Sequence, residues 1–116
     1  MPFATRQILE HHAKALAEGN IAAIMADYAD DAVLVMLDRN YVGKAAVQEY
    51  WTNGLAAFKG GKLTPLGLGV HGNLALTTWS FASSAVTIPV GVDSYVIRND
   101  KIAQQTCYYT VVPKGA

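Results

Sequence analysis

Residues 8–43, ILEHHAKALAEGNIAAIMADYADDAVLVMLDRNYVG, decide the fold of this 116-residue chain. An apolar stripe with helical spacing predicts a first helix over residues 5–18. The Gly-Asn pair at 19–20 ends that helix and caps a second one, which we expect to stop at the Asp-Asp pair of 30–31. Residues 32–37 then form a nearly continuous apolar strand, predicted to be buried on both faces or nearly so. This order packs short helices against a sheet.

The rest of the chain predicts a third helix followed by a sheet. The helix covers residues 44–58, and Gly60-Gly61 ends it. Four strands with turn residues between them follow: residues 63–70, 74–83, 86–97 and 102–112. Pro65 marks the first of these as an edge or bent strand, whereas the last is long enough to lie centrally. We therefore predict an α+β protein, with three N-terminal helices on one face of a strongly curved, mainly antiparallel sheet.

Composition limits the class of protein. The length fits a single domain, residues 1–116, with a sizeable core. Hydrophobic residues make up 52% of the chain, which leaves apolar surface for a pocket and an oligomer face. Nine acidic residues balance nine basic ones, so the electrostatic footprint of nucleic-acid binding is absent. The chain shows no membrane-length apolar run and no signal-peptide layout, and we expect a cytoplasmic protein.

Metal and cofactor signatures are also absent from the sequence. The single cysteine, Cys107, excludes an internal disulfide and a cysteine-cluster zinc site. His11 and His12 are adjacent, so they point about 100° apart and lack the i, i+4 spacing of a helical metal pair. No glycine-rich phosphate loop follows a strand. We expect neither a metal nor a cofactor.

Four segments resemble the nuclear transport factor 2-like superfamily, most closely its SnoaL-like and ketosteroid-isomerase-like branches. They are ALAEGNIAAIMADYADDAVLV (15–35), VGKAAVQEYW (42–51), HGNLALTTWSF (71–81) and VDSYVIRNDKIAQQ (92–105). The resemblance spans nearly the whole chain and implies a cone-shaped, cystatin-like roll with an apolar pocket behind its open mouth. It also implies a homodimer formed through the outer sheet face. Because the superfamily hosts unrelated activities, function has to be argued from the site.

His12 is the first candidate for acid/base chemistry. Ile8 and Leu16 lie four residues to either side, which puts His12 near the centre of the apolar face, whereas His11 falls on its margin. A hydrogen-bonded core histidine and a pocket acid or base both fit this position. The resemblance puts His12 where ketosteroid isomerases have their oxyanion-hole tyrosine, so it is also a candidate hydrogen-bond donor to a developing oxyanion.

Asp93 is the second candidate, because it interrupts an apolar strand. Tyr95 and Ile97 share its face, and a carboxylate there is costly unless it is paired or protonated. The resemblance matches Asp93 to the ketosteroid-isomerase aspartate that an apolar site keeps protonated. An aspartate that faces solvent at a strand edge, or bonds a backbone amide, is the alternative. Burial raises the pKa of such a group, and a nearby cationic His12 lowers it.

The isomerase pattern breaks at the end of the first strand. The family's catalytic base is an aspartate at the position of Met36. Asp38 lies two residues further and shares the same face if the strand continues that far. In the alternative, Asp38 forms a turn with Arg39 and Asn40. Asp38 is kept as a third catalytic candidate, and without a base at Met36 the carbon-to-carbon proton shuttle does not carry over.

The resemblance places one face of the last strand inside the cone. Gln105, Cys107 and Tyr109 alternate onto that face, where the first and last offer polar tips on an apolar wall. Cys107 has no activating base in the sequence and is expected to be a buried, inert thiol. Most of the chain's aromatic side chains also fit a packed core. The candidate ligand-binding residues are Met36, Trp51, Trp79, Tyr95, Gln105 and Tyr109.

Three functions from different classes remain open. The first is an acid/base enzyme of isomerase, cyclase or hydrolase type, in which His12 and Asp93 polarise an oxygen of a small, largely apolar compound. The second is a non-catalytic module that binds a small apolar ligand in the same pocket, which fits the absence of a base at Met36. The third is a structural dimerisation domain whose interior is filled by side chains. Neither nucleic acid nor a membrane is an expected partner.

Overall fold

The computed structural model describes residues 4–114, so residues 1–3 and 115–116 of the predicted domain lie outside it. In chain order the elements are α1 (Thr5–Glu18), α2 (Ile21–Ala26), β1 (Tyr28–Val35), β2 (Asn40–Val42), α3 (Lys44–Ala57), β3 (Lys62–His71), β4 (Leu74–Ala82), β5 (Val86–Arg98), β6 (Lys101–Tyr109) and β7 (Val112–Pro113). The strands form one sheet in the order β2-β1-β6-β5-β4-β3, and β7 pairs with β5. Only β1 and β6 run parallel among the described pairs.

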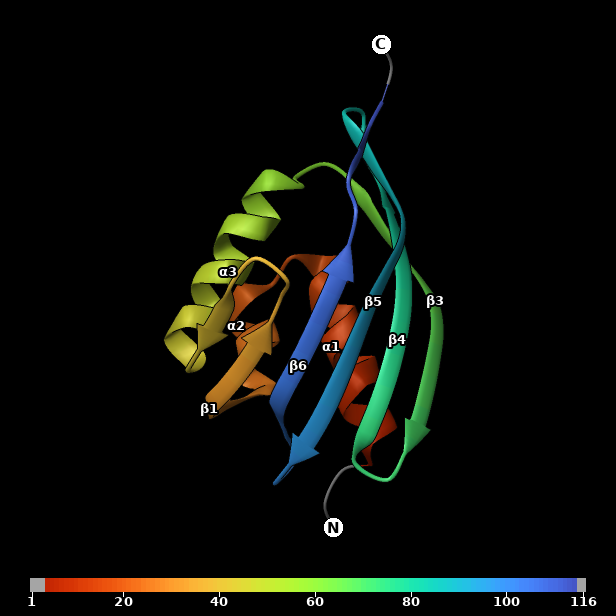
Figure 1. Cartoon of the computed structure of the whole chain (residues 1–116). Helices are drawn as coiled ribbons and strands as arrows, with labels where there is room; N and C mark the ends of the chain where they lie inside the picture. Colours follow the sequence, from red (N-terminus) through yellow and green to blue (C-terminus); the bar gives the residue numbers. More distant parts are fainter. Residues whose placement is uncertain (1–3, 115–116) are drawn as a thin grey trace.

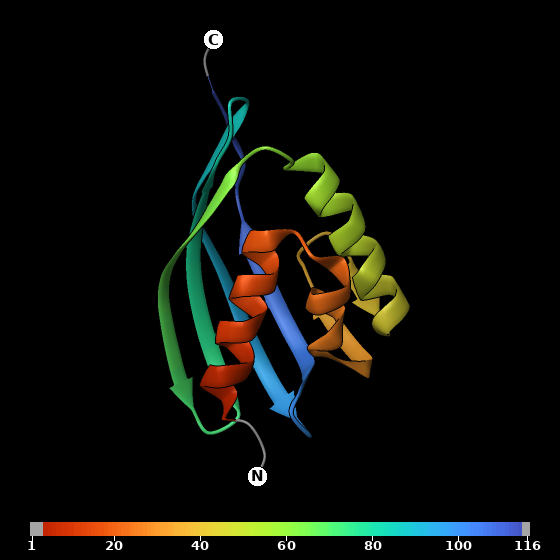
Figure 2. The same cartoon turned by 180° about the vertical axis from the view of Figure 1, so that it is seen from behind.

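All three helices lie on the same side of the curved sheet (Figures 1 and 2). Helix α1 packs on β3 and β4, and α3 packs on β1 and β2, with α2 between the two helices. The predicted α+β class is therefore confirmed. The central position of β6 and the edge position of β3 are as the sequence indicated. No helix within residues 4–114 is long and apolar enough to cross a membrane.

The junction of α2 and β1 differs from the prediction. We expected Asp30-Asp31 to stop the second helix, but α2 ends at Ala26 and both aspartates lie within β1. The helix ends early because Asp27 turns the chain into the sheet, where its carbonyl oxygen accepts a hydrogen bond of 2.7 Å from the amide of Ile102. An irregular register after Tyr28 leaves the two aspartates exposed.

Strand β1 is buried on one face only, which corrects the prediction for residues 32–37. Ala32 and Leu34 are fully buried, whereas Val35 is 42% exposed and Leu37, beyond the strand, is 88% exposed. The helices cover one face of the sheet, so alternate residues of the strand have no layer above them. The short strand β2 was not predicted; it pairs with β1 from the other side of a turn.

Strands β5 and β6 form a hairpin around a tight turn at Asn99-Asp100, in agreement with the sequence. Both turn residues have positive φ, 53° and 64°, as a two-residue turn of this hand requires. The last predicted strand is divided: β6 ends at Tyr109, and β7 resumes at Val112 to pair with the start of β5. The hairpin places the inward residues of β5 and β6 side by side.

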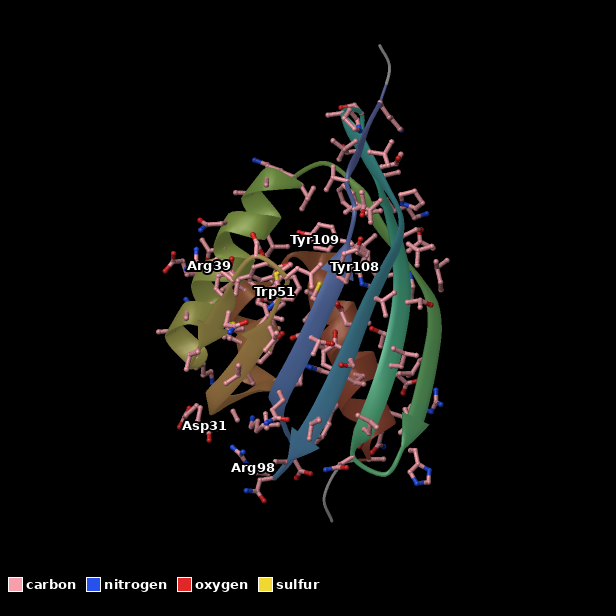
Figure 3. The ribbon with its side chains drawn as sticks, in the orientation of Figure 1. Asp31, Arg39, Trp51, Arg98, Tyr108 and Tyr109 are labelled. Carbon is pink, nitrogen blue, oxygen red and sulfur yellow. The ribbon has the colours of Figure 1, made fainter. Side chains whose placement is uncertain are left out.

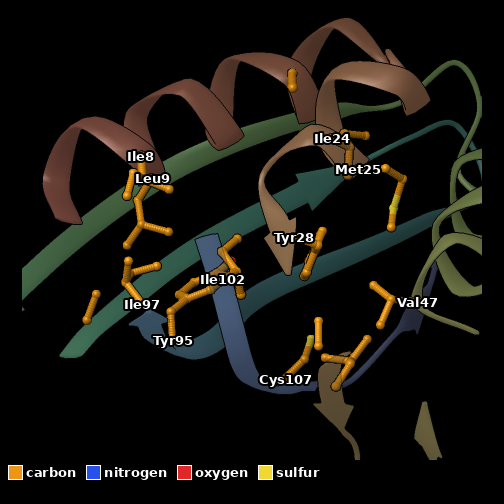
Figure 4. Close-up of a cluster of buried hydrophobic side chains, with 14 residues drawn as sticks. Ile8, Leu9, Ile24, Met25, Tyr28, Val47, Tyr95, Ile97, Ile102 and Cys107 are labelled. Carbon is orange, nitrogen blue, oxygen red and sulfur yellow. The ribbon is translucent and has the colours of Figure 1, made fainter. Parts of the chain in front are cut away.

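The core lies between the helices and the concave face of the sheet (Figure 4). Side chains of α1 and α2, among them Ile8, Leu9 and Ile24, point toward those of the strands. Polar side chains are buried in the same layer: Thr5, His12, Asp27, Asp93 and Gln105. A buried polar group is costly unless it is hydrogen-bonded, so these residues define where a site can be built.

Gly91 is required where Trp79 lies against strand β5. A Cβ atom at Gly91 would come within 2.2 Å of the indole ring, while a Cβ at Gly69 meets nothing within 4 Å. We expect Gly91→Ala to lower the free energy of unfolding by about 1–3 kcal/mol, as overpacking does. Gly69→Ala, the control, is expected to change it little. Urea unfolding of both variants measures this, and equal midpoints would contradict the packing argument.

Candidate functional site

A continuous line of polar side chains crosses the buried interior. It runs through residues of α1, the α2–β1 junction, β6 and β5, in the order Asp27, His12, Tyr28, Gln105, Tyr95 and Asp93. The register of the sheet sets its second half, because Tyr95 lies opposite Gln105 and Asp93 lies opposite Cys107. Periodicity of α1 sets its first half by turning His12 toward the sheet. Each of these side chains is buried.

Asp27 holds two histidines with one carboxylate. His12 Nδ1 lies 3.0 Å from Asp27 Oδ2, and His11 Nδ1 lies 2.9 Å from Oδ1 and 3.0 Å from Oδ2. The His11 side chain is 54% exposed and that of His12 is 2% exposed. The marginal position predicted for His11 and the central one for His12 agree with this. Asp27 therefore joins an exposed imidazole to a buried one.

The other ring nitrogen of His12 faces the interior. His12 Nε2 lies 3.5 Å from the hydroxyl of Tyr28, which accepts a hydrogen bond of 3.1 Å from Trp51 Nε1 and donates one to Gln105 Oε1. The rings of Tyr28, Trp51 and Tyr95 stand edge-on to the imidazole, with centroids 5.3, 6.1 and 6.1 Å away. Burial raises the pKa of Tyr28 above its ordinary value, so it remains a hydrogen-bond donor.

Asp93 ends the line with one oxygen unused. Its Oδ2 accepts a hydrogen bond of 3.2 Å from the Tyr95 hydroxyl, which in turn accepts one of 3.4 Å from Gln105 Nε2. Its Oδ1 is buried and has no hydrogen-bond partner within residues 4–114. Burial raises the pKa of the carboxyl above its ordinary value, although the neighbouring Cys107 thiol, the Tyr95 hydroxyl, His12 and Trp79 act in the opposite direction. A native structure rarely leaves such an atom unpaired.

Half-buried aromatic rings form a wall beside Asp93. The ring centroids of Trp79 and Tyr109 lie 5.5 Å apart. The Phe58 ring lies between Tyr109 and Phe81, with centroid distances of 6.4 and 5.0 Å. Trp51 and Tyr109 lie toward the C-terminal end of β6, away from the Asp31–Arg98 pair at the other end of the sheet (Figure 3). Met36 packs against the buried hydrophobic core. Cys107 is buried, and burial raises its pKa, which agrees with an inert thiol.

Asp38 lies outside the buried line. Strand β1 ends at Val35, and the amide of Met36 bonds the carbonyl of Arg39 at 3.1 Å, so Asp38 belongs to an exposed turn. The turn alternative is thus the one the structure adopts. The charge of Asp38 still helps to raise the pKa of the Tyr109 phenol, although burial is the larger cause. A catalytic role for Asp38 stays a prediction.

Of the residues in the interior line, Tyr28 alone borders one of the two described hollows. One, of about 320 Å³, is lined by Tyr28 and by charged residues of β1 and the β5–β6 turn. The other, of about 390 Å³, lies at the β3–β4 hairpin beside Leu74, Leu76 and Ser94. Neither hollow is lined by His12 or Asp93. Within residues 4–114 no group of three or more His, Cys, Asp or Glu side chains is placed to hold a metal ion.

Sequence reasoning missed Asp27 and misassigned Tyr28. The second helix was predicted to run up to Asp30-Asp31, which would include Tyr28, but Tyr28 begins β1 and carries the central hydroxyl of the line. Asp27 precedes Asp30 and Asp31 by a few positions, and nothing in the local pattern separates a buried aspartate from two exposed ones. The useful signal is His12 itself, because a buried imidazole needs a polar partner from another element.

The family follows from a match that covers most of the chain. Residues 9–105 match the model of the SnoaL-like domain. This chain belongs to the SnoaL-like domain family. The stretch includes every residue of the polar line, so the site is built from the domain itself. The chain matches no curated protein.

Solved structures show the same fold. A nuclear transport factor 2-like protein of unknown function from Burkholderia xenovorans superposes with a TM-score of 0.81 at 24% identity, covering 97% of this chain and 86% of that one. A putative polyketide cyclase from Sinorhizobium meliloti superposes with a TM-score of 0.75 at 22% identity, covering 91% of this chain and 100% of that one. A putative ketosteroid isomerase from Kribbella flavida superposes with a TM-score of 0.80 at 16% identity, covering 97% of this chain and 82% of that one. The nuclear transport factor 2-like, cystatin-like roll is confirmed.

The raised pKa of Asp93 predicts a pH-dependent stability. Above the ordinary value of 3.8 the unfolded chain has released a proton that the folded protein still holds. Stability therefore falls as pH rises from that value through the folded pKa, by about 1.4 kcal/mol per unit of pKa difference. Asp93→Asn lacks this titration, so its stability relative to the native protein is expected to increase with pH across that window.

Urea unfolding of both proteins between pH 4 and pH 8 measures the difference, since the other titrating groups are common to both. Asn53→Ala, at an exposed position of α3, removes no titrating group and is the control, expected to show a constant difference. If the stability difference between Asp93→Asn and the native protein were also independent of pH, burial would not disfavour the ionised form of the Asp93 carboxyl.

Proposed function

We propose that this protein is an acid/base enzyme that acts on a small, largely apolar compound carrying a carbonyl, enol or epoxide oxygen. The observation that carries the proposal is the buried, unpaired Oδ1 of Asp93. Burial favours the protonated carboxyl, and a protonated carboxyl in an apolar site donates a hydrogen bond to a developing oxyanion. A ligand oxygen at that atom would complete its hydrogen bonding.

His12 supplies the second half of the chemistry. With Nδ1 bonded to Asp27, the ring presents Nε2 to the interior, where it takes up or releases a proton. Asp27 orients the ring, as a carboxylate partner does for a histidine base. Tyr95 lies between the two groups: its ring packs edge-on to the imidazole and its hydroxyl bonds Asp93. The reaction class is therefore proton transfer next to a polarised oxygen, of isomerase, cyclase or hydrolase type.

Access to this site requires the aromatic wall to move. Trp51, Trp79 and Tyr109 are only partly buried, whereas His12, Tyr95 and Gln105 are at most 3% exposed. We place the ligand's apolar body against these partly buried rings and Met36, with its oxygen toward Asp93. Gln105 holds the Tyr95 hydroxyl in position through its amide.

A non-catalytic binding module is the second candidate, and the interior itself favours it. Most polar atoms of the line already bond one another, so they define a rigid wall rather than a set of free reactive groups. Met36 also stands at the position where the isomerase resemblance calls for a base. Such a module would bind the same apolar, oxygen-containing ligands and leave them unchanged.

A ligand panel separates the two candidates. The putative ketosteroid isomerase and polyketide cyclase among the similar structures suggest a steroid enone and a polycyclic aromatic ketone as probes, with a small cyclic epoxide as the third. We expect at least one probe to raise the melting temperature and to be converted to product, detected by mass spectrometry. Asp93→Asn should weaken its binding about tenfold, since one buried hydrogen bond is altered.

His12→Gln should lower turnover about 10²–10⁴-fold, as loss of a general acid or base does, and leave binding nearly unchanged. His71→Gln, at an exposed position of β3, is the control. Binding without conversion in the native protein would support the binding module. Binding and turnover that are indifferent to both substitutions would remove this site from the proposal.

We also propose that the protein forms a homodimer through the outer sheet face. That face has no helix over it (Figure 1) and carries exposed apolar side chains, among them Val35, Val42, Leu76 and Tyr108, which are 42–70% exposed. Leu76→Glu is expected to shift the protein to monomers in sedimentation velocity, because a charge there would be buried in the interface. Leu37→Glu, in the β1–β2 turn and 88% exposed, should not. A monomeric native protein would refute the proposal.

A further inference from the structure

The candidate base His12 is almost sealed from solvent. Its side chain is only 2% exposed, and Tyr28, Trp51 and Tyr95 surround the ring. A buried group that takes up or releases a proton has to exchange it with water before it can act again. The interior offers no such exit through Tyr28, Tyr95 or Asp93, because all three are buried themselves. The remaining side of the ring faces Asp27.

Asp27 leads from the buried imidazole to an exposed one. Oδ2 of Asp27 lies 3.0 Å from Nδ1 of His12 and 3.0 Å from Nδ1 of His11. Because both rings meet the carboxylate through Nδ1, each presents Nε2 on its far edge. For His11 that edge belongs to a side chain that is 54% exposed, and for His12 it faces the Tyr28 hydroxyl. The three residues therefore form an unbroken chain from water to the interior.

We propose that His11, Asp27 and His12 form a proton path between solvent and the buried site. The inference rests on the proposed acid/base role of His12. In this inward step His11 starts with its proton on Nδ1 and His12 with its proton on Nε2, so that only His11 donates to Asp27 at the start. Water protonates His11 at Nε2, and the ring releases its Nδ1 proton to Oδ2 of Asp27. That proton passes to Nδ1 of His12, which releases its Nε2 proton to the interior. At the end Asp27 is ionised again, the His11 proton has moved from Nδ1 to Nε2, and the His12 proton has moved from Nε2 to Nδ1. Transfer of a proton in the opposite direction restores both rings.

The position of His11 on helix α1 favours this role. Adjacent residues on a helix diverge by about 100°, so one side chain of the pair reaches solvent while the other reaches the core. The turn at Asp27, between α2 and β1, brings one carboxylate between them. An exposed histidine suits the outer position, because one ring nitrogen can accept a proton from water while the other donates one to Asp27.

Exchange of the His12 ring proton with water tests the path without a substrate. Protein labelled with 15N-histidine gives the rate from saturation transfer between water and the His12 N–H. His11→Gln keeps an N–H donor for Asp27, but an amide does not relay protons. We expect this variant to slow the exchange about 10²-fold, the lower end of what a positioned acid or base contributes. His71→Gln, which alters the third histidine, should leave the rate unchanged.

A second variant separates proton transfer from structure. His11→Ala removes the ring and should also slow the exchange, and free imidazole added to the solution is expected to restore it. Equal rates in the native protein and both variants, or a slow rate that imidazole does not restore, would overturn the path. Native turnover of a probe together with unchanged exchange in His11→Gln would sustain the function and reject the path. Slowed exchange in His11→Gln, in a protein that converts no probe, would sustain the proton path and reject the proposed enzymatic function.

Discussion

The contact between His12 and Asp27 is the interaction on which the arrangement of the site depends. Asp27 caps α2 through its backbone amide, accepts a hydrogen bond from β6 through its carbonyl, and binds the two histidines of α1 through its carboxylate. One residue therefore fixes two helices relative to the centre of the sheet. Without that carboxylate, a buried imidazole on the apolar face of α1 would be a costly defect. With it, the same imidazole becomes an oriented polar group.

The polar line extends this constraint across the cone. Each member satisfies the next, from Tyr28 to Gln105 to Tyr95, so that one misplaced side chain leaves a buried partner without a hydrogen bond. The line is complete except at Oδ1 of Asp93. An incomplete end within an otherwise satisfied network is where a ligand gains most, because its oxygen supplies a bond that the folded protein lacks. Ligand binding thus benefits from the unpaired Oδ1 of Asp93, whereas the stability of the folded protein would benefit from pairing it.

Much of the fold follows from the sequence, but the centre of the site follows only in part. Helical periodicity predicts α1 and α3. Alternation puts Asp93 and Tyr95 on one face of their strand, and the family resemblance turns the face of Gln105 inward. Those patterns are local. The burial of Asp27, by contrast, depends on where α2 meets β6, a contact between segments far apart in the chain. Local sequence does not distinguish it from Asp30 and Asp31, which face solvent a few residues later.

The division between a rigid line and a looser wall bears on how such a site changes specificity. The line is buried, directional and mutually bonded, so substitutions within it disturb the fold as well as the chemistry. Trp79 and Tyr109 of the wall are partly exposed and held by ring contacts, which tolerate changes of shape more readily. Trp51 differs, because it also donates a hydrogen bond to the Tyr28 hydroxyl of the line. Gly91 is the exception, because Trp79 fills the space of its missing side chain. Ligand choice is therefore free to vary at the wall while the polarising groups behind it stay in place.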